Sequence, residues 1–356
     1  MSPDHTDHRQ THQLTPTKPT PTMRQGSTPT TGQTTLQTTG LAFGAVTILL
    51  TLLSWSSVPL FLRYFADEID AWTSNGWRYG AAALIWAPLA FFATRTGRAP
   101  RSTWKSALVP SVFNATAQVC FTWAHYMIDP GLLTFGLRVQ IICVAIGAYL
   151  LFPGERRVIR SAAYLIGFTL VLVGVLGTAL LGETSFTGAH AFGFILAALS
   201  GALFAGYALA VKRCLTGTNP VLAFAIISQY TGAAMVALML LLGASAGAGA
   251  ITALTAGQFW LLLFSAVIGI ALGHVFYYIA IDRLGVAVSS GVIQLQPFLV
   301  AVGSYFLFDE ALTAPQWISG SIAVGGAMLM LSAQRRLNRQ RAKATFAKPA
   351  IAIAQD

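Results

Sequence analysis

Ten apolar runs follow one another along the chain from Leu41 onward, each long enough to cross a bilayer as a helix. None of them alternates apolar and polar residues as barrel strands do, so the pattern predicts helices. Polar, charged, Gly and Pro residues separate the runs. The predicted spans are Leu41–Leu62, Trp72–Ala93, Trp104–Tyr126, Leu132–Phe152, Ser161–Leu181, Ala191–Val211, Pro220–Leu242, Gln258–Ile281, Val286–Phe308 and Pro315–Leu331.

Two polar segments flank the apolar runs. Residues 1–40 are rich in Thr, Pro, Gln and Ser and contain no apolar run, which predicts a disordered cytoplasmic tail. Residues 333–356 are basic and are expected to form a second cytoplasmic tail. The first apolar core begins only at Leu41, so we expect no signal peptide.

The fourth and ninth runs resemble each other, which indicates an internal repeat. Aligning them makes these positions coincide: Tyr149–Phe152 with Tyr305–Phe308, Gln140 with Gln296, and Arg138 with Gln294. A repeat at this separation predicts two similar halves of five helices each, residues 41–181 and 190–332.

Composition supports a membrane protein, because 55% of the residues are hydrophobic and only 10% are charged, against about 25% charged in soluble domains. The net charge of +10 need not indicate nucleic acid. Most basic residues lie in alternate connections between the runs, whereas the other connections are acidic, and this asymmetry indicates topology. The basic segments are residues 95–105, 156–160, 212–213 and 283 and the C-terminal tail, so both termini are predicted to be cytoplasmic.

An odd number of spans in each half has a functional consequence. The second half must enter the membrane with the opposite polarity, which makes an all-α protein of about ten transmembrane helices arranged as two inverted five-helix repeats. Many secondary transporters have this architecture, with the substrate bound near the bilayer midplane between the repeats. A membrane receptor or scaffold without transport activity is the alternative, but it leaves the inverted repeat unexplained.

Each half of the chain contains distinctive motifs. The first half has Trp55, Arg78 and Pro153-Gly154-Glu155, and the second has YIAIDRLG at Tyr278–Gly285, Pro297, Asp309-Glu310, and Gln316-Trp317 followed by Gly320. With these motifs the chain from Leu41 to Leu331 resembles the EamA-type members of the drug/metabolite transporter (DMT) superfamily. The resemblance implies a small-molecule carrier in the cytoplasmic (inner) membrane, often an exporter of amino acids or other metabolites. The family commonly has a mid-span proline in the fourth helix, where this chain has Ile141.

Arg138 lies within the predicted fourth span, and no Asp or Glu occurs at comparable depth in any predicted span. A charge at the centre of a membrane helix costs roughly 2.5–3.5 kcal/mol on insertion scales. We therefore expect Arg138 to face a wet cavity and to bind an anionic group of the substrate, such as a carboxylate. The alternative is that it binds helix carbonyls or extends towards the outer face.

Other polar residues within the spans are candidates for substrate binding. His274 could carry or sense a proton or could be a neutral interhelical residue, and Tyr277 lies on the same helix face. Asn114 and Gln118 belong to a polar stripe in the third span that either lines a pore or joins helices. Gln294 is expected to face the cavity, whereas Gln296 should point about 200° away from it and join helices. Trp55 is expected to belong either to an aromatic wall of the cavity or to the packing between helices.

The sequence offers no basis for an enzyme. It has no nucleophile–base pair, paired intramembrane carboxylates, metal-ligand cluster or phosphate loop, so we expect no catalytic residues, metal, cofactor or direct ATP use. The expected partners are a small-molecule substrate and the lipid bilayer, and no nucleic acid. Glycine faces in the fifth and tenth spans would also allow a homodimer. Glu155 and Glu310 lie at span ends, where a gate, a helix cap or a solvated end are the alternatives.

Overall fold

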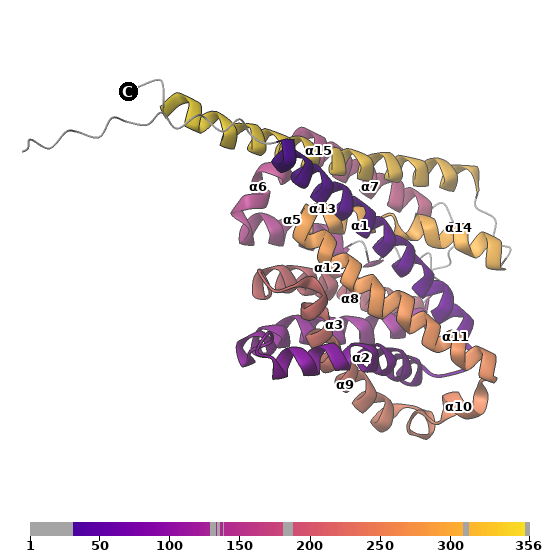
Figure 1. Cartoon of the computed structure of the whole chain (residues 1–356). Helices are drawn as coiled ribbons and strands as arrows, with labels where there is room; N and C mark the ends of the chain where they lie inside the picture. The colour runs from indigo at the N-terminus through magenta and orange to yellow at the C-terminus, as the bar shows by residue number, and fades with distance from the viewer. Residues whose placement is uncertain are drawn as a thin grey trace, which may run out of the picture.

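A computed structural model describes residues 31–128, 133, 136–137, 139–180, 188–308 and 313–352. Within these residues the regular elements are helices and no strand occurs (Figure 1). The first half contains α1 (Thr31–Ala66), α2 (Ala71–Arg95), α3 (Arg101–His125), α5 (Val139–Leu151), α6 (Pro153–Ile159) and α7 (Ala162–Leu180). The second half contains α8 (Gly188–Cys214), α9 (Pro220–Leu242), η1 (Ala244–Gly247), α10 (Gly249–Ala253), α11 (Ala256–Ala266), η2 (Val267–Leu272), α12 (Gly273–Leu284), α13 (Val286–Ile293), α14 (Gln296–Phe308) and α15 (Ala314–Ala352).

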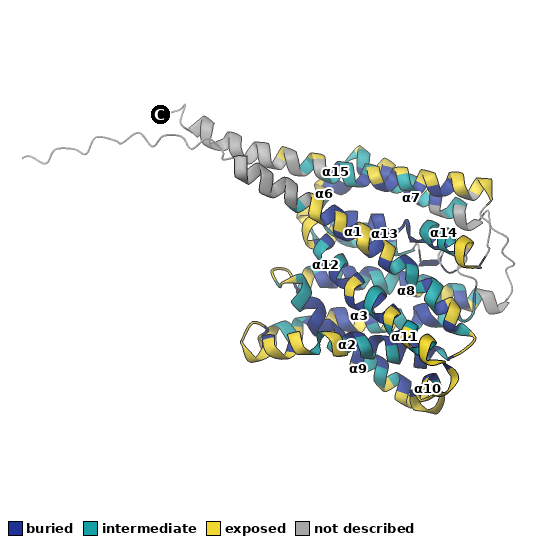
Figure 2. Cartoon of the chain, turned by 45° about the vertical axis from the view of Figure 1, so that its right-hand side comes forward, coloured by how far each residue is buried: buried dark blue, intermediate teal, exposed yellow. Residues whose placement is uncertain are grey.

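The protein is a multi-pass membrane protein. Six helical runs in the described part of the chain are long and apolar enough to cross a bilayer, and a seventh is added if the bent pair α6–α7 forms one span. Large apolar side chains such as Leu84, Leu241 and Phe306 are more than 70% exposed, as expected for helices that face lipid. Figure 2 shows such exposed positions on the outer sides of the helices, with buried positions between them. The predicted number of ten spans stays a prediction, because α2, α3 and the 13-residue α5 lie outside this set.

The main contacts between the two halves are symmetric: where two helices contact each other across the halves, their equivalents in the repeat also contact each other. Equivalent helices pair with each other, α2 with α9 and α7 with α15. Non-equivalent helices pair twice: α3 packs on α8 and α12 on α1, while α5 packs on α8 and α14 on α1. A two-fold relation between repeats requires such matched pairs. In Figure 1 the pair α7–α15 lies at the top of the molecule and the pair α2–α9 at the bottom.

Three helices differ from the sequence-based expectations. α1 begins at Thr31 inside the segment expected to be disordered, because the last proline of that segment is Pro29 and nothing after it stops a helix before the first apolar run. α15 continues to Ala352 through the basic tail. The ninth span was expected to be one kinked helix, but α13 ends at Ile293 and α14 begins at Gln296.

The glycines of the fifth and tenth spans bring α7 and α15 together within the chain. A Cβ atom added to Gly167 would lie 2.6 Å from the carbonyl oxygen of Gly326, and the reverse distance is also 2.6 Å. The two backbones can approach this closely only because neither residue has a side chain. This pair of glycines is therefore used inside one molecule, and the homodimer stays a prediction.

Candidate functional site: a cavity between the two halves

A cavity of about 60 Å³ lies between the halves, with room for a handful of water molecules. Both halves contribute to its wall. The lining residues are Trp55, Val58, Arg78, Tyr79, Gln118, Phe121, Leu137 and Gln140 from the first half, and Phe204, Gly269, Ile270, His274, Ile293 and Gln296 from the second. The wall also includes two irregular places in the second half. The π-helical segment η2 provides Gly269 and Ile270, and the break between α13 and α14 separates Ile293 from Gln296. π-helical turns of this kind often occur at functional sites.

Arg78 brings a positive charge to the cavity. Its side chain is 2% exposed, and its Nε donates a hydrogen bond to Ser265 Oγ at 3.0 Å. The Ser265 hydroxyl in turn donates to the carbonyl oxygen of Leu262 at 2.6 Å, so its orientation is fixed. The Nη2 group of Arg78 is buried and has no hydrogen-bond partner. Of the ion pairs found among the described residues, Lys212–Glu155 and Arg283–Asp282, neither includes Arg78.

Trp55 and His274 form an aromatic part of the wall. Their ring centroids are 5.0 Å apart, and the Trp55 ring is also 4.8 Å from that of Tyr277. The Nδ1 of His274 lies 3.1 Å from the carbonyl oxygen of Ile270, which can only accept, so Nδ1 carries the hydrogen. The Nε1–H group of Trp55 is buried without a partner. The wall therefore presents two buried donors that no described protein group satisfies, on Trp55 and on Arg78.

Three glutamines contribute amide groups to the lining. Gln118 comes from α3, and the other two are Gln140 and Gln296, which the sequence repeat makes equivalent. The Nε2 of Gln296 donates to the backbone oxygen of Trp55 at 2.8 Å, which ties α14 to α1. Gln294 is fully buried outside the lining, and its Nε2 donates to the carbonyl oxygen of Ser290 at 3.1 Å. The expected directions of Gln294 and Gln296 assumed a continuous helix, and the break between them removes that basis.

Two other predicted site residues, Asn114 and Tyr277, lie apart from the described lining. Asn114 is buried where α3 meets α9, and its Nδ2 donates to Thr231 Oγ1 at 3.3 Å. Tyr277 is 1% exposed, and its hydroxyl shares a 2.8 Å hydrogen bond with that of Ser290. Arg138 lies outside the described residues. Its role as the substrate anchor, and the substrate-binding roles of the whole predicted set, stay predictions.

Sequence reasoning did not identify Arg78 as a site residue. Its signal was present, because it is a charged residue six positions into the predicted span Trp72–Ala93. Arg138 was predicted as the anion-binding residue instead, because it is a charge within the fourth predicted span and no Asp or Glu lies at comparable depth. Gln140 was also not predicted as a site residue, although the repeat aligns it with Gln296. Both of these glutamines lie in the cavity wall.

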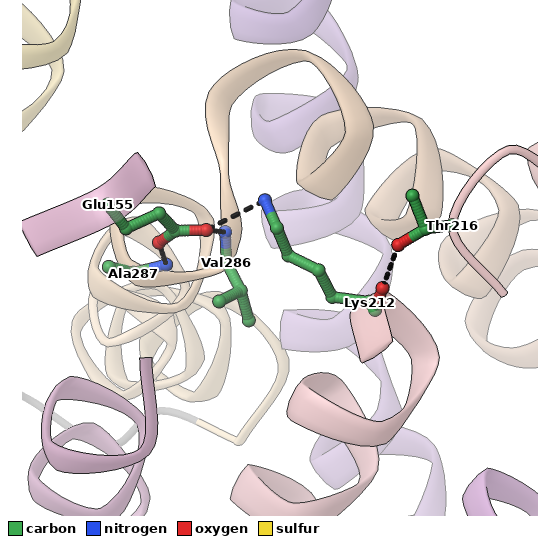
Figure 3. A network of polar contacts seen from close by, with 5 residues as sticks. All are labelled: Glu155, Lys212, Thr216, Val286 and Ala287. Atoms are coloured by element: carbon green, nitrogen blue, oxygen red, sulfur yellow. Dashed lines mark hydrogen bonds and ion pairs between the residues drawn. The ribbon is translucent and has the colours of Figure 1, made fainter. Parts of the chain in front are cut away.

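A second polar cluster joins the halves at a distance from the cavity. The Glu155 carboxylate, on α6 of the first half, accepts hydrogen bonds from the backbone N–H groups of Val286 at 3.1 Å and Ala287 at 3.0 Å. It also pairs with Lys212 Nζ at 2.7 Å, at the end of α8 (Figure 3). The Glu155 side chain is only 12% exposed, so it caps a helix rather than being a solvated helix end.

Gly285 makes this cap possible. It precedes α13 with φ 87° and ψ 158°, a conformation that residues with a side chain rarely adopt. A Cβ atom at this position would lie 3.1 Å from Glu155 Oε1. The capped end of α13 and Ile293 in the cavity wall are separated by seven residues, or about 10 Å of helix. We refer to Glu155, Lys212 and the first turn of α13 as the Glu155 tie.

Comparison with known proteins identifies the family. Residues 42–184 and 191–332 each match the EamA-like transporter family, so one match covers each half. Among solved structures 29 chains match, and one, described only as "Crystal structure of protein", aligns with a TM-score of 0.64 over 84% of this chain and 99% of that chain. Its sequence identity is 17%, so it shows a shared fold alone. No curated protein matches the sequence. Because the two matched segments cover most of the sequence, the chain belongs to the EamA-like transporter family.

Proposed function

We propose that this protein is a secondary carrier that exports a small metabolite, an amino acid or another compound with a carboxylate, across the cytoplasmic membrane. The observation that carries this proposal is the cavity, whose wall comes from both repeats and combines a buried cation, amide groups and aromatic rings. A site at the junction of two repeats is suited to open first to one side and then to the other. Membership of the EamA-like transporter family supports transport, and the family resemblance supports the outward direction.

The transport cycle is alternating access by rocking of one half against the other. The matched packing of the halves supports this, because the contacts of α3 and α5 with α8 have equivalents in the contacts of α12 and α14 with α1. One set of contacts can therefore loosen while the equivalent set tightens. The π-helical segment η2 and the break between α13 and α14 lie in the cavity wall. Small changes there would alter the site without unfolding a whole span.

The membrane orientation follows from the basic segments. Residues 95–105, 156–160 and 212–213 and the C-terminal tail carry an excess of Lys and Arg, which favours the cytoplasmic side. Both termini are then cytoplasmic in the inner membrane. On this orientation the Glu155 tie closes the cytoplasmic side of the carrier.

The test has two stages, binding and flux. The detergent-purified protein is screened by thermal shift against amino acids, organic acids, sugars and nucleosides. A compound at 100 times its Kd stabilises the native state by about 2.7 kcal/mol, which gives a measurable shift. Compounds that stabilise the protein are then loaded into proteoliposomes, and their efflux is compared with that from protein-free liposomes. Carrier-dependent efflux with counterflow supports the proposal, whereas binding without flux would identify a receptor and refute it.

A further inference from the structure

We propose that Arg78 is the anion-binding group of the central cavity and holds the carboxylate of the transported compound. This inference rests on the proposed function for the movement of the ligand, but the binding itself can be measured without transport. It also gives the cavity a charge preference: compounds with an accessible carboxylate are bound, and simple cations are rejected.

The first argument is the state of the guanidinium. Arg78 is 2% exposed in the described structure, and its Nη2 has no hydrogen-bond partner. A buried charge is normally paired, because burial removes its hydration. Gly269 lies beside this group, since a Cβ atom added there would contact Nη2 at 3.6 Å, but it would also clash with the Val58 side chain at 2.5 Å. Arg78 is one of the residues that line the cavity, so a ligand bound there would lie beside its guanidinium group.

The second argument is that the side chain is held in place. The Arg78 Nε–Ser265 bond fixes one edge of the guanidinium, and the Ser265 hydroxyl is itself fixed by its bond to Leu262. Ser265 belongs to the second half and Arg78 to the first, so the cation lies where the two halves meet. A preorganised guanidinium is suited to bind the planar carboxylate group.

The third argument is the complementarity of hydrogen-bonding groups. Trp55 Nε1 and Arg78 Nη2 are both donors, and both are buried without a partner in the same cavity wall. An ionised carboxylate offers only acceptors, so it can satisfy both kinds of donor. An ammonium group offers only donors and a positive charge, and would leave both protein groups unpaired.

The experiment uses a matched three-carbon series, chosen for the small cavity: propionate, propionamide and propylamine. Apparent Kd values come from thermal-shift titrations of the full-length protein, in its wild-type form and as Arg78→Gln and Arg95→Gln. Arg95 is the control because it lies on the same helix, is exposed and is outside the cavity wall. We expect propionate to bind the wild type and the Arg95 variant, and propionamide and propylamine to bind at least tenfold more weakly. In Arg78→Gln the propionate affinity should fall at least tenfold.

Equal binding of propionate by wild type and Arg78→Gln overturns the proposal, as does equal binding of propionate and propionamide by the wild type. If Arg78→Gln is not recovered folded, Arg78→Lys keeps the charge but loses the planar fork. It should bind propionate several-fold more weakly than the wild type, and unchanged affinity refutes the role of the guanidinium.

The liposome assay separates this inference from the proposed function. Arg78-dependent carboxylate binding without flux supports the anion site and refutes the carrier. Flux of a neutral or cationic compound that Arg78→Gln leaves unchanged supports the carrier and refutes the anion site.

Discussion

Replacing Glu155 by glutamine should open the face that, in the proposed transport cycle, the Glu155 tie closes. In the described structure the carboxylate accepts two backbone N–H bonds from α13 and pairs with Lys212. A glutamine has a single acceptor oxygen, so its amino group would be placed against one of these donors. The tie joins the two halves, and the proposed cycle requires them to separate on this side. Weakening it should therefore favour the open form.

The size of the effect follows from the kind of bond that is lost. Hydrogen bonds to charged groups contribute about 1.5–3 kcal/mol, and the Glu155 carboxylate is largely shielded from water. We expect the closed form to lose about 2 kcal/mol relative to the open form. At 1.4 kcal/mol per tenfold change, the open population should rise roughly 30-fold. The change would be smaller in a protein that is already mostly open.

The measurement is cysteine accessibility. Ser289 lies on α13 one turn beyond the tie and is fully buried, so Ser289→Cys reports opening. In a background without the native cysteines, a membrane-impermeant maleimide is applied from each side of oriented vesicles. In Glu155→Gln the labelling rate from the basic face should rise by up to roughly 30-fold, in proportion to the open population. Labelling from the other face should fall or stay unchanged.

Two controls identify the cause. Glu68→Gln makes the same change at an exposed position and should leave labelling unchanged. Lys212→Gln should reproduce part of the effect, and combining it with Glu155→Gln should add little, because Lys212 acts on the tie through Glu155. If Glu155→Gln changes neither the labelling nor the thermal midpoint, the reasoning is wrong and the tie does not hold the halves together.

Three further predictions concern stability. Gly285→Ala should lower the thermal midpoint by the equivalent of about 1–2 kcal/mol, because alanine is strained at φ 87° and crowds Glu155; a midpoint equal to wild type would contradict this. Gly167→Leu should prevent the close approach to Gly326 and reduce the yield of folded protein in size-exclusion chromatography, and a normal elution profile would refute it. Burial raises the pKa of Asp70, but its hydrogen bonds lower the pKa by more, to a net value below 3.8. The ionised Asp70 side chain therefore stabilises the fold fully above about pH 5, and this stabilisation is lost as the pH falls through the lowered pKa. The thermal midpoint of Asp70→Asn should accordingly depend less on pH between 5 and 3 than the thermal midpoint of the wild type.

The overall architecture could be predicted from sequence because it depends on local apolar runs and on the similarity of the two halves. The alignment of Gln140 with Gln296 even marked two positions that lie in the cavity wall. The direction of Gln296 could not be predicted, because a regular helix was assumed through Pro297. A proline lacks the N–H that would continue the helix, but sequence does not show whether the chain bends or breaks there.

The contacts of Arg78 and Glu155 were beyond sequence reasoning for a different reason. Arg78 is fixed by Ser265, 187 positions later, and Glu155 caps an N–H group 131 positions later. A charged residue within an apolar run indicates that a partner or a wet cavity must exist, but it does not identify the partner. Only the packing of α2 against α11 and of α6 near α13 decides which groups meet.

Asp70 and Glu155 both cap a helix and both bond across the halves, yet their surroundings give them different roles. Asp70 accepts hydrogen bonds from the backbone of Thr73 and, across the halves, from Ala244 at 3.0 Å. Its two sides belong to α2 and to η1, which directly follows α9; α2 packs along α9 and against η1, so these elements can move as one body. Glu155 joins α6 to α13 and α8, whose contacts with α6 are few apart from the tie itself. A carboxylate between two closely packed helices stabilises the fold. A carboxylate between helices with few other contacts can lose its hydrogen bonds at little cost to the stability of the fold. Of the two, Glu155 is therefore the one whose removal should change access to the cavity.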